Sequence, residues 1–317
     1  MIYAAGDIHG QLDALNGLLK HLTYRNNVGG GTLDGRRLEP DDQVIFLGDY
    51  VDRGQNSKAV IDRLIAFKRD EHPNTHFLKG NHEGMMIGGL DAARSIAANP
   101  FSRNKNQHDL EVLDFWLSNG GMQTISSYSG ETTLENWKWV DSFPEEHIDW
   151  IDDLENQVDT THYTFVHAGL VPPGNAWVPR WYQPDPRQWI RANFIDSDAD
   201  FGGKCVVFGH TPQRATMLPL VLPNKIGLDT GCAFDRGFLT LAAFDDSKPY
   251  DPLVYEKRRV FDADGKWRFS ENRQYHSFWR FAQSGNMLSM LRSLNYGCVD
   301  EVIVHDPDGY SITSNPN

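Results

Sequence analysis

The sequence has few cysteines and no long apolar run. Its three cysteines, Cys205, Cys232 and Cys298, are widely separated, which argues against a disulfide framework and fits a reducing compartment. No stretch approaches the roughly 20 apolar residues of a membrane-spanning helix, and the opening residues MIYAAGDIHG lack the basic region of a signal peptide. We therefore expect a cytoplasmic protein with no membrane partner.

Basic side chains are also under-represented. The 43 Asp and Glu residues outnumber the 30 Lys and Arg residues, which gives a formal net charge of −13. Such a charge disfavours nucleic-acid binding and is compatible with a site that holds cations. With 317 residues, 40% of them hydrophobic, the chain can form one substantial core and a smaller appendage. The oligomeric state is left open.

The first half of the chain alternates short apolar runs with amphipathic segments. Strands are expected at 1–6, 43–48 and 75–80, with helices at 11–22 and 57–71. Because strands joined by helices pair in parallel through right-handed crossovers, this order predicts the start of an α/β fold. Further strands are expected at 162–169, 205–211, 225–231 and 237–245.

Two other regions have a different character. Residues 84–155 are rich in Trp and polar side chains and predict a mostly helical insertion, whose core includes Trp137, Trp139 and Trp150. Beyond residue 245, the segments 258–270 and 301–312 each flank an Asp-Gly turn and predict β-hairpins. We expect one domain over residues 1–245, with the insertion inside it, and a C-terminal extension of unassigned role over 246–317.

Polar side chains follow five of the expected strands. Ligands bind outside the carboxyl ends of strands in open α/β sheets, so these side chains are expected to meet at one edge. In chain order the positions are Asp7, His9, Asp49, Asp52, Arg53, Asn81, His82, Glu83, His167 and His210.

The metal-binding side chains in this set offer oxygen and imidazole nitrogen but no thiolate. Such donors suit Mn, Fe, Zn or a similar divalent ion. They are too many for one ion with open positions, and a carboxylate can bridge two ions about 3.5–4 Å apart. Asp49, whose loop is central in the chain order, is the expected bridge.

Five motifs, in this order, resemble those of the calcineurin-like metallophosphoesterases, and within them the bacterial-type phosphoprotein phosphatases. They are GDIHG (6–10), GDYVDRG (48–54), GNHE (80–83), HAGL (167–170) and GHTP (209–212). WLSNGGMQTISSY (116–128) and QWIRANF (188–194) also resemble segments of the bacterial members. The resemblance implies two packed mixed β-sheets flanked by helices, with the site at the strand ends.

The resemblance also implies roles for individual residues. One ion would be held by Asp7 and His9, a second by Asn81, His167 and His210, with Asp49 between them. The implied catalytic residues are the general acid His82, its orienting partner Asp52 and the phosphate-binding Arg53. Two residues are left with alternatives: Arg191 as a second phosphate clamp or a structural salt-bridge residue, and Asp229 as a support for the site or a turn residue.

The implied reaction is phosphoester hydrolysis with a metal-bridging hydroxide as nucleophile. Manganese is the expected ion, with Fe and Zn as alternatives. GNHE and GDYVDRG favour phosphoserine and phosphothreonine of proteins as substrates. The alternatives are a symmetrical bis(5′-nucleosyl)-tetraphosphatase with a similar site, or a catalytically inactive phosphopeptide-binding module. The presence of His82, Asp52 and every expected ligand disfavours the inactive module.

Overall fold

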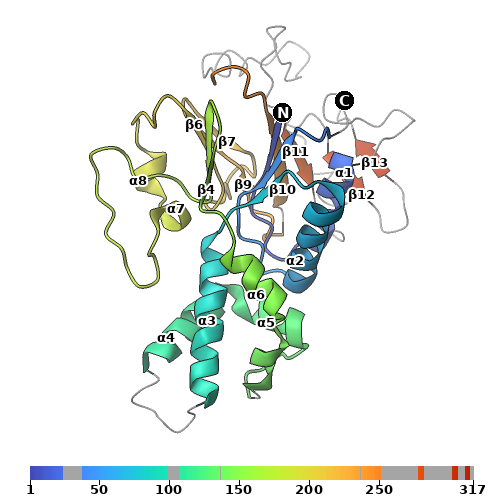
Figure 1. Cartoon of the computed structure of the whole chain (residues 1–317), viewed down its shortest axis with the longest axis vertical. Helices are drawn as coiled ribbons and strands as arrows, with labels where there is room; N and C mark the ends of the chain where they lie inside the picture. The colour runs from blue at the N-terminus through green and yellow to red at the C-terminus, as the bar shows by residue number, and fades with distance from the viewer. Residues whose placement is uncertain are drawn as a thin grey trace.

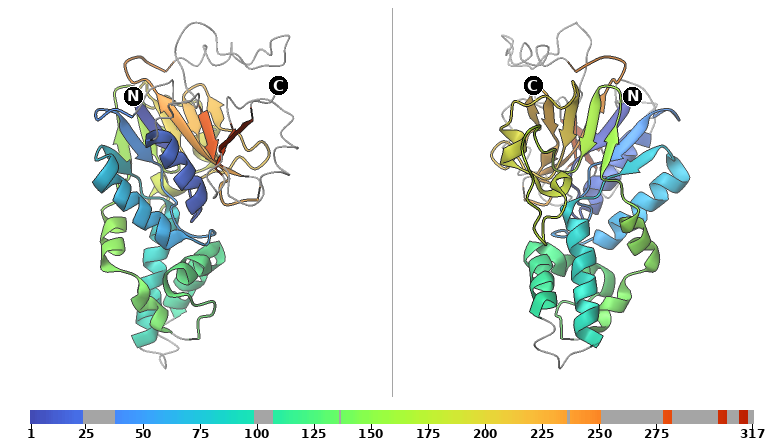
Figure 2. Two further views of the ribbon diagram at one scale, coloured as in Figure 1. Left: turned by 90° about the vertical axis from the view of Figure 1, so that its right-hand side faces the viewer. Right: turned by 60° about the vertical axis from the view of Figure 1, so that its left-hand side comes forward.

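The computed structural model describes residues 1–23, 38–98, 107–135, 137–235, 237–250, 278–281, 302–305 and 311–314. In Figure 1 the two β-sheets occupy the upper part of the molecule, and the helices α3–α6 lie below them. In both views of Figure 2 these helices extend from one end of the sheets, away from the N-terminus.

The first sheet begins with the predicted parallel strands. β1 (Ile2–Ala5), β2 (Gln43–Phe46) and β3 (Thr75–Phe77) pair in parallel. Their connections are α1 (Leu12–Thr23) and α2 (Ser57–Ala66), the second of which continues into a π-helical turn, Phe67–Glu71. The predicted strand–helix order is therefore confirmed. β10 (Phe238–Phe244) pairs antiparallel with β1 and makes the sheet mixed.

Three strands from the C-terminal region extend this sheet beyond β10. They are β11 (Phe278–Phe281), β12 (Val302–His305) and β13 (Ser311–Ser314). β12 and β13 pair antiparallel, which confirms the hairpin predicted at 301–312. The hairpin predicted at 258–270 lies outside the described residues.

The second sheet has the order β4-β5-β6-β8-β7. Its parallel centre is β5 (Tyr163–Val166), β6 (Cys205–Phe208) and β8 (Lys225–Gly227). The antiparallel edges, β4 (Gln157–Asp159) and β7 (Leu220–Leu222), were not predicted, because β4 contains a single apolar residue and β7 lies between Pro219 and Pro223.

The single strand predicted at 225–231 is wrong. β8 belongs to the second sheet, whereas β9 (Asp229–Thr230) pairs with β10 of the first. Between them Leu228 donates its backbone N–H to Phe208 O at 2.7 Å and is fully buried. The chain thus crosses from one sheet to the other, and the apolar pattern of the sequence is continuous across the crossing.

The two sheets pack face to face, and helices cover their outer faces. Along β1, Ile2 and Ala4 face the core between the sheets, whereas Tyr3 and Ala5 face the core shared with α1 and α2. The short helices α7 (Pro186–Trp189) and α8 (Ala192–Ile195) cover the second sheet through Phe194. These layers confirm the predicted fold of two mixed sheets flanked by helices.

The predicted helical insertion is confirmed as well. It contains α3 (Asn81–Ala98), α4 (Gln107–Trp116), a π-helical turn (Leu117–Gly121), α5 (Met122–Ser129), a 3₁₀ helix (Trp137–Ser142) and α6 (Glu145–Asp152). Trp139 is buried in its core, and the ring of Trp150 contacts Phe77 of β3 at 5.1 Å. None of the helices described here is both long and apolar enough to cross a bilayer.

Candidate active site

The loops that follow β1, β2, β3, β5 and β6 meet at one end of the sheets, where α3 begins. Asp49 Oδ1 accepts a hydrogen bond from the His82 backbone N–H at 3.0 Å, which joins the β2 loop to α3. Asp7 Oδ2 accepts one from the His210 backbone N–H at 3.0 Å, which joins the two sheets. All six predicted metal ligands are buried here: Asp7, His9, Asp49, Asn81, His167 and His210.

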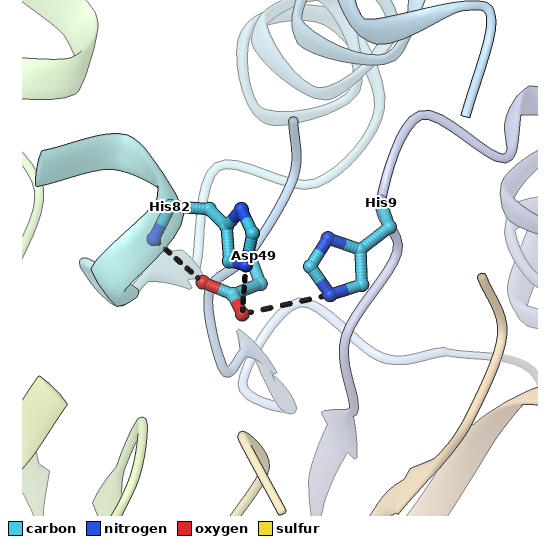
Figure 3. A group of neighbouring side chains, drawn as sticks. All are labelled: His9, Asp49 and His82. Carbon is cyan, nitrogen blue, oxygen red and sulfur yellow. Dashed lines mark hydrogen bonds and ion pairs between the residues drawn. The ribbon is translucent and has the colours of Figure 1, made fainter. Parts of the chain in front are cut away.

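One group of side chains able to hold a metal ion consists of His9, Asp49 and His82 (Figure 3). Their ligand atoms all lie within 4.8 Å of one another. Asp49 Oδ2 is 3.6 Å from His9 Nε2 and 3.9 Å from His82 Nε2. This group does not contain Asp7, which was expected to pair with His9. Both oxygens of Asp7 instead lie within hydrogen-bond distance of the His210 backbone N–H. His82, expected outside the metal shell, lies almost as close to Asp49 as His9 does.

A second such group consists of Asp49, His167 and His210. Asp49 Oδ1 lies 3.3 Å from His167 Nε2, and Asn81 Oδ1 lies 3.1 Å from the same nitrogen. Asp49 belongs to both groups and directs a different oxygen toward each. That is the arrangement a bridging carboxylate requires.

The hydrogen-bond partners of these histidines indicate that the second group fits a cation. His167 Nδ1 must donate its hydrogen to the carbonyl oxygen of Leu47 at 2.7 Å. In the neutral imidazole the Nε2 lone pair then faces two oxygens, an arrangement that is repulsive unless a proton or a metal ion lies between them. His210 Nε2 is buried and has no hydrogen-bond partner among the described residues. The residues present therefore fit a metal ion.

The ionisation equilibria lead to the same conclusion. Burial and the neighbouring Asp229 raise the pKa of Asp7 well above its usual value. Burial and Arg53 lower the pKa of His9 well below its usual value, which keeps the imidazole in its neutral, metal-binding form. Although burial opposes it, Asp49 raises the pKa of His167 to about 9. Asp7 thus lies close to two other buried carboxyl groups, Asp49 and Asp229, and a divalent cation would reduce the repulsion between them.

His82 and Arg53 form a third part of the site. His82 Nδ1 donates to Asp52 Oδ2 at 2.7 Å, and both side chains are buried. Arg53 directs Nη1 to His9 Nε2 at 2.6 Å and Nη2 to His82 Nε2 at 2.9 Å. The guanidinium therefore lies across the two imidazoles, with its donors pointing into the site.

The insertion holds Asp52 in place, a role that the sequence analysis missed. Asp52 Oδ1 accepts hydrogen bonds from Trp116 Nε1 at 3.0 Å and Thr124 Oγ1 at 2.6 Å. The carbonyl of Gly120, whose φ is +104°, accepts the Arg53 backbone N–H at 3.1 Å. These residues lie within the segment 116–128. Its resemblance to bacterial phosphatases is the feature of the sequence that could have indicated this role.

Glu83 also has a positioning role that the sequence analysis missed. Its carboxylate accepts backbone N–H groups from Asp49 at 2.9 Å, Tyr50 at 2.7 Å and Gly80 at 2.9 Å. Burial and Asp49 raise the pKa of Glu83 to about 7. Through these bonds the first turn of α3 fixes the loop that carries Asp49.

The backbone is strained at the same positions. Of the six non-glycine residues described with positive φ, five are predicted site residues: His9, Asp49, Asp52, Arg53 and His210. Such conformations cost on the order of 1–3 kcal/mol each and concentrate at functional sites. The strain therefore marks this edge of the sheets independently of the side-chain chemistry.

Arg191 and Asp229 lie beside this cluster. Arg191 is exposed, and its Nη1 donates to the carbonyl of His210 at 2.9 Å. It forms no salt bridge with any residue in the described part of the chain. Asp229 is buried, accepts the Gly231 backbone N–H at 2.9 Å and acts electrostatically on Asp7. It is thus both a turn residue and a neighbour of the site.

Known proteins are similar to this chain over the region that contains the site. The family described as calcineurin-like phosphoesterase matches residues 1–214. The candidate serine/threonine-protein phosphatase C27B7.6 of Caenorhabditis elegans is 45% identical over 109 residues, or 34% of this chain and 20% of that protein. Serine/threonine-protein phosphatase BSL2 of Arabidopsis thaliana is 39% identical over 85 residues, or 27% of this chain and 8% of that protein. The chain therefore spans at most a fifth of these relatives.

Among solved structures, one described as a candidate diadenosine tetraphosphatase is 19% identical, with a TM-score of 0.42. The match covers 76% of this chain and 87% of that chain.

Proposed function

The chain belongs to the calcineurin-like phosphoesterase family, and we propose that it is a protein phosphatase acting on phosphoserine and phosphothreonine with the help of two divalent metal ions. The proposal depends on the arrangement of side chains at the site. The hydrogen-bonded pair His82–Asp52, the guanidinium of Arg53 and two ligand groups that share Asp49 lie together at one buried edge.

We assign the metal-holding residues as follows. Asp7 and His9 with Asp49 would hold one ion, and Asn81, His167 and His210 with Asp49 would hold the other. When bound, the ions supply a positive charge for the phosphate oxygens and lower the pKa of a water molecule that attacks phosphorus. Manganese is the proposed ion, because oxygen and imidazole donors without thiolate suit it, with Fe and Zn as alternatives.

His82 is assigned as the general acid. Its Nδ1–H is bound by Asp52, so its Nε2 is the atom that carries the proton to the leaving oxygen. In the absence of substrate, Arg53 donates to that Nε2. Phosphate oxygens accept from the planar guanidinium fork more strongly than neutral imidazoles do. A bound phosphate would therefore draw the Arg53 donors away from both histidines and free His82 Nε2 for contact with the leaving oxygen.

Arg191 is assigned as a second phosphate contact. Arg191 is an exposed residue whose guanidinium has no described carboxylate partner within salt-bridge distance and donates to the carbonyl of His210. Two arginines on different loops can bind a phosphoryl group from two directions.

Two observations support phosphoserine and phosphothreonine as the substrate class. GNHE and GDYVDRG are the forms of the motifs that favour protein phosphatases, and the two curated relatives named above are described as serine/threonine-protein phosphatases. Hydrolysis of bis(5′-nucleosyl) tetraphosphates would use the same ligand groups, and the experiment below separates the two.

The purified protein with Mn²⁺ is expected to prefer a phosphopeptide. We expect its kcat/KM on a phosphoserine or phosphothreonine peptide to exceed that on a dinucleoside tetraphosphate by at least about tenfold, the discrimination that one good substrate contact provides. An aryl phosphate in the same panel reports whether the preparation is active. Efficient release of nucleoside diphosphates with negligible peptide turnover would reverse the assignment.

Trp116→Phe is expected to lower kcat roughly tenfold without loss of metal. The substitution keeps an aromatic ring, though a smaller one, at the buried position and removes the N–H that holds Asp52 Oδ1. A hydrogen bond to a charged group contributes about 1.5–3 kcal/mol, and each 1.36 kcal/mol in the barrier changes the rate tenfold. The measurements are kcat on a phosphopeptide and metal content by elemental analysis.

The matched control is Trp139→Phe. Trp139 is equally buried in the insertion, but its Nε1 has no hydrogen-bond partner among the described residues. We expect wild-type kcat for this variant. Equal losses in the two variants would show that the effect comes from packing and that Trp116 does not position Asp52.

A further inference from the structure

A cavity of about 400 Å³ opens beside the site, between α3, α4 and the segment 181–189. The lining residues that matter here are Met85, Asp91, Asp109, Phe115, Trp181 and Trp189. The mechanism proposed above uses none of them.

The cavity begins directly next to the catalytic residues. Gly84 and Met85, which line it, follow His82 in the first turns of α3. At the other wall, the ring of Trp189 lies 6.2 Å from the ring of His210. A peptide bound at the metal groups would therefore have this cavity beside it.

The walls of the cavity are aromatic. The ring of Phe115 lies 5.6 Å from that of Trp181, 5.3 Å from Tyr182 and 6.1 Å from Trp189. Trp181 is 51% exposed, an unusual degree for so large an apolar ring. Exposed aromatic faces that gather around a cavity mark a binding surface.

The charge of the cavity is negative. Asp91 and Asp109 line it, and no Lys or Arg does so among the described residues. The helix α4 carries Glu111 and Asp114 as well, without any Lys or Arg. Two arginines lie nearby but do not line the cavity: Arg94 is 3.7 Å from Asp91, and Arg180 donates to the hydroxyl of Tyr182 at 2.7 Å.

We propose that this cavity binds a lysine or arginine side chain of the phosphorylated protein substrate, an inference that rests on the proposed function. Aromatic faces attract such cations, and nearby carboxylates add to the attraction. The same charge repels a second nucleotide with its chain of phosphates, so the cavity selects for peptides that carry a basic residue near the phosphorylated one.

The geometry limits where that basic residue lies. Gly84 and Asp91 are two and nine residues beyond His82 on α3. At a rise of 1.5 Å per residue, the cavity extends from roughly 3 to 14 Å along the helix from the general acid. An extended peptide advances about 3.3–3.6 Å per residue, so the basic residue is one to four positions from the phosphorylated residue.

The test uses phosphoserine peptides that differ at one position. Arginine, alanine or glutamate is placed at each position from one to four residues before or after the phosphoserine, and kcat/KM is measured with Mn²⁺. We expect arginine to be favoured over alanine by roughly three- to thirtyfold at one or more positions, the range of a cation on partly desolvated aromatic rings. Glutamate at the same position is expected to be worse than alanine.

Two variants test whether the preference for arginine in the peptide comes from the cavity. Trp181→Ala and Asp91→Asn, both at exposed positions, are expected to reduce the arginine-to-alanine ratio toward one. Val178→Ala is the matched control, because Val178 is 76% exposed in the same region of the chain and does not line the cavity. It should keep the wild-type ratio.

The outcomes separate this inference from the proposed function. Equal turnover of all the phosphopeptides, or a preference that survives in both cavity variants, would overturn the cavity assignment and leave the phosphatase assignment standing. An enzyme that hydrolyses the aryl phosphate and the dinucleoside tetraphosphate but none of the peptides would overturn both.

Discussion

Replacing Asp49 with asparagine is expected to remove metal and activity together. Asp49 belongs to both ligand groups and is the only residue they share. Asparagine keeps the shape and one oxygen, so Oδ1 can still accept the His82 backbone N–H. The negative charge between two cations is lost, however, and the second oxygen becomes an amide group that cannot bind metal.

The expected loss of metal affinity in Asp49→Asn can be estimated from substitutions that act less directly on a metal site. Loss of a residue that only supports a metal ligand costs 10–100-fold in metal affinity, so loss of a shared ligand should exceed about 100-fold. We expect less than about one metal ion per chain after dialysis, and activity below about 1% of wild type. Elemental analysis and phosphopeptide turnover are the two measurements.

Asp41→Asn is the control for this variant. Asp41 precedes β2 at its amino end, whereas Asp49 follows the same strand at its carboxyl end, and Asp41 is exposed. The control removes the same charge from the opposite end of one strand and should retain metal and activity. If Asp49→Asn keeps two ions and normal turnover, Asp49 is not the bridge.

The sequence was sufficient to predict which residues would meet. Parallel strands direct their carboxyl ends to one edge, so the positions after five apolar runs identified Asp7, Asp49 and His167 as neighbours although they are far apart in the chain. Strand order and direction suffice for Asp7 and Asp49, which follow strands of one sheet, whereas His167 follows a strand of the second sheet, and the resemblance alone implied two packed sheets.

The sequence was not sufficient to predict what holds those residues. Trp116 and Thr124 are 64 and 72 residues from the Asp52 carboxylate that they bind. Their contacts depend on how α4 and α5 fold back on the β2 loop, and no local pattern records that packing. The crossing of the chain at Leu228 is similar, because a continuous apolar run has the same appearance whether it stays in one sheet or joins two.

His82→Asn is expected to separate catalysis from metal binding. Its Nδ1 is bonded to Asp52 at 2.7 Å, which fits an oriented general acid. Its Nε2 is 3.9 Å from Asp49 Oδ2, which leaves metal ligation as the competing interpretation. General acid catalysis contributes typically ~10²–10⁴-fold, so kcat on a phosphopeptide should fall by a factor in that range. Metal content and KM should change little.

The leaving group decides between the two interpretations. A nitrophenolate departs without a proton, so the loss in His82→Asn should be much smaller on nitrophenyl phosphate than on a phosphoserine peptide, whose alkoxide needs protonation. Asp52→Asn should show the same dependence in a milder form, because the imidazole remains but is less firmly oriented. His167→Asn provides the contrast: it removes a residue of the second ligand group and should lose metal and activity on both substrates. If His82→Asn also strips metal, or loses equal activity on good and poor leaving groups, then His82 is a metal ligand together with His9 and Asp49, and the proton must come from another group.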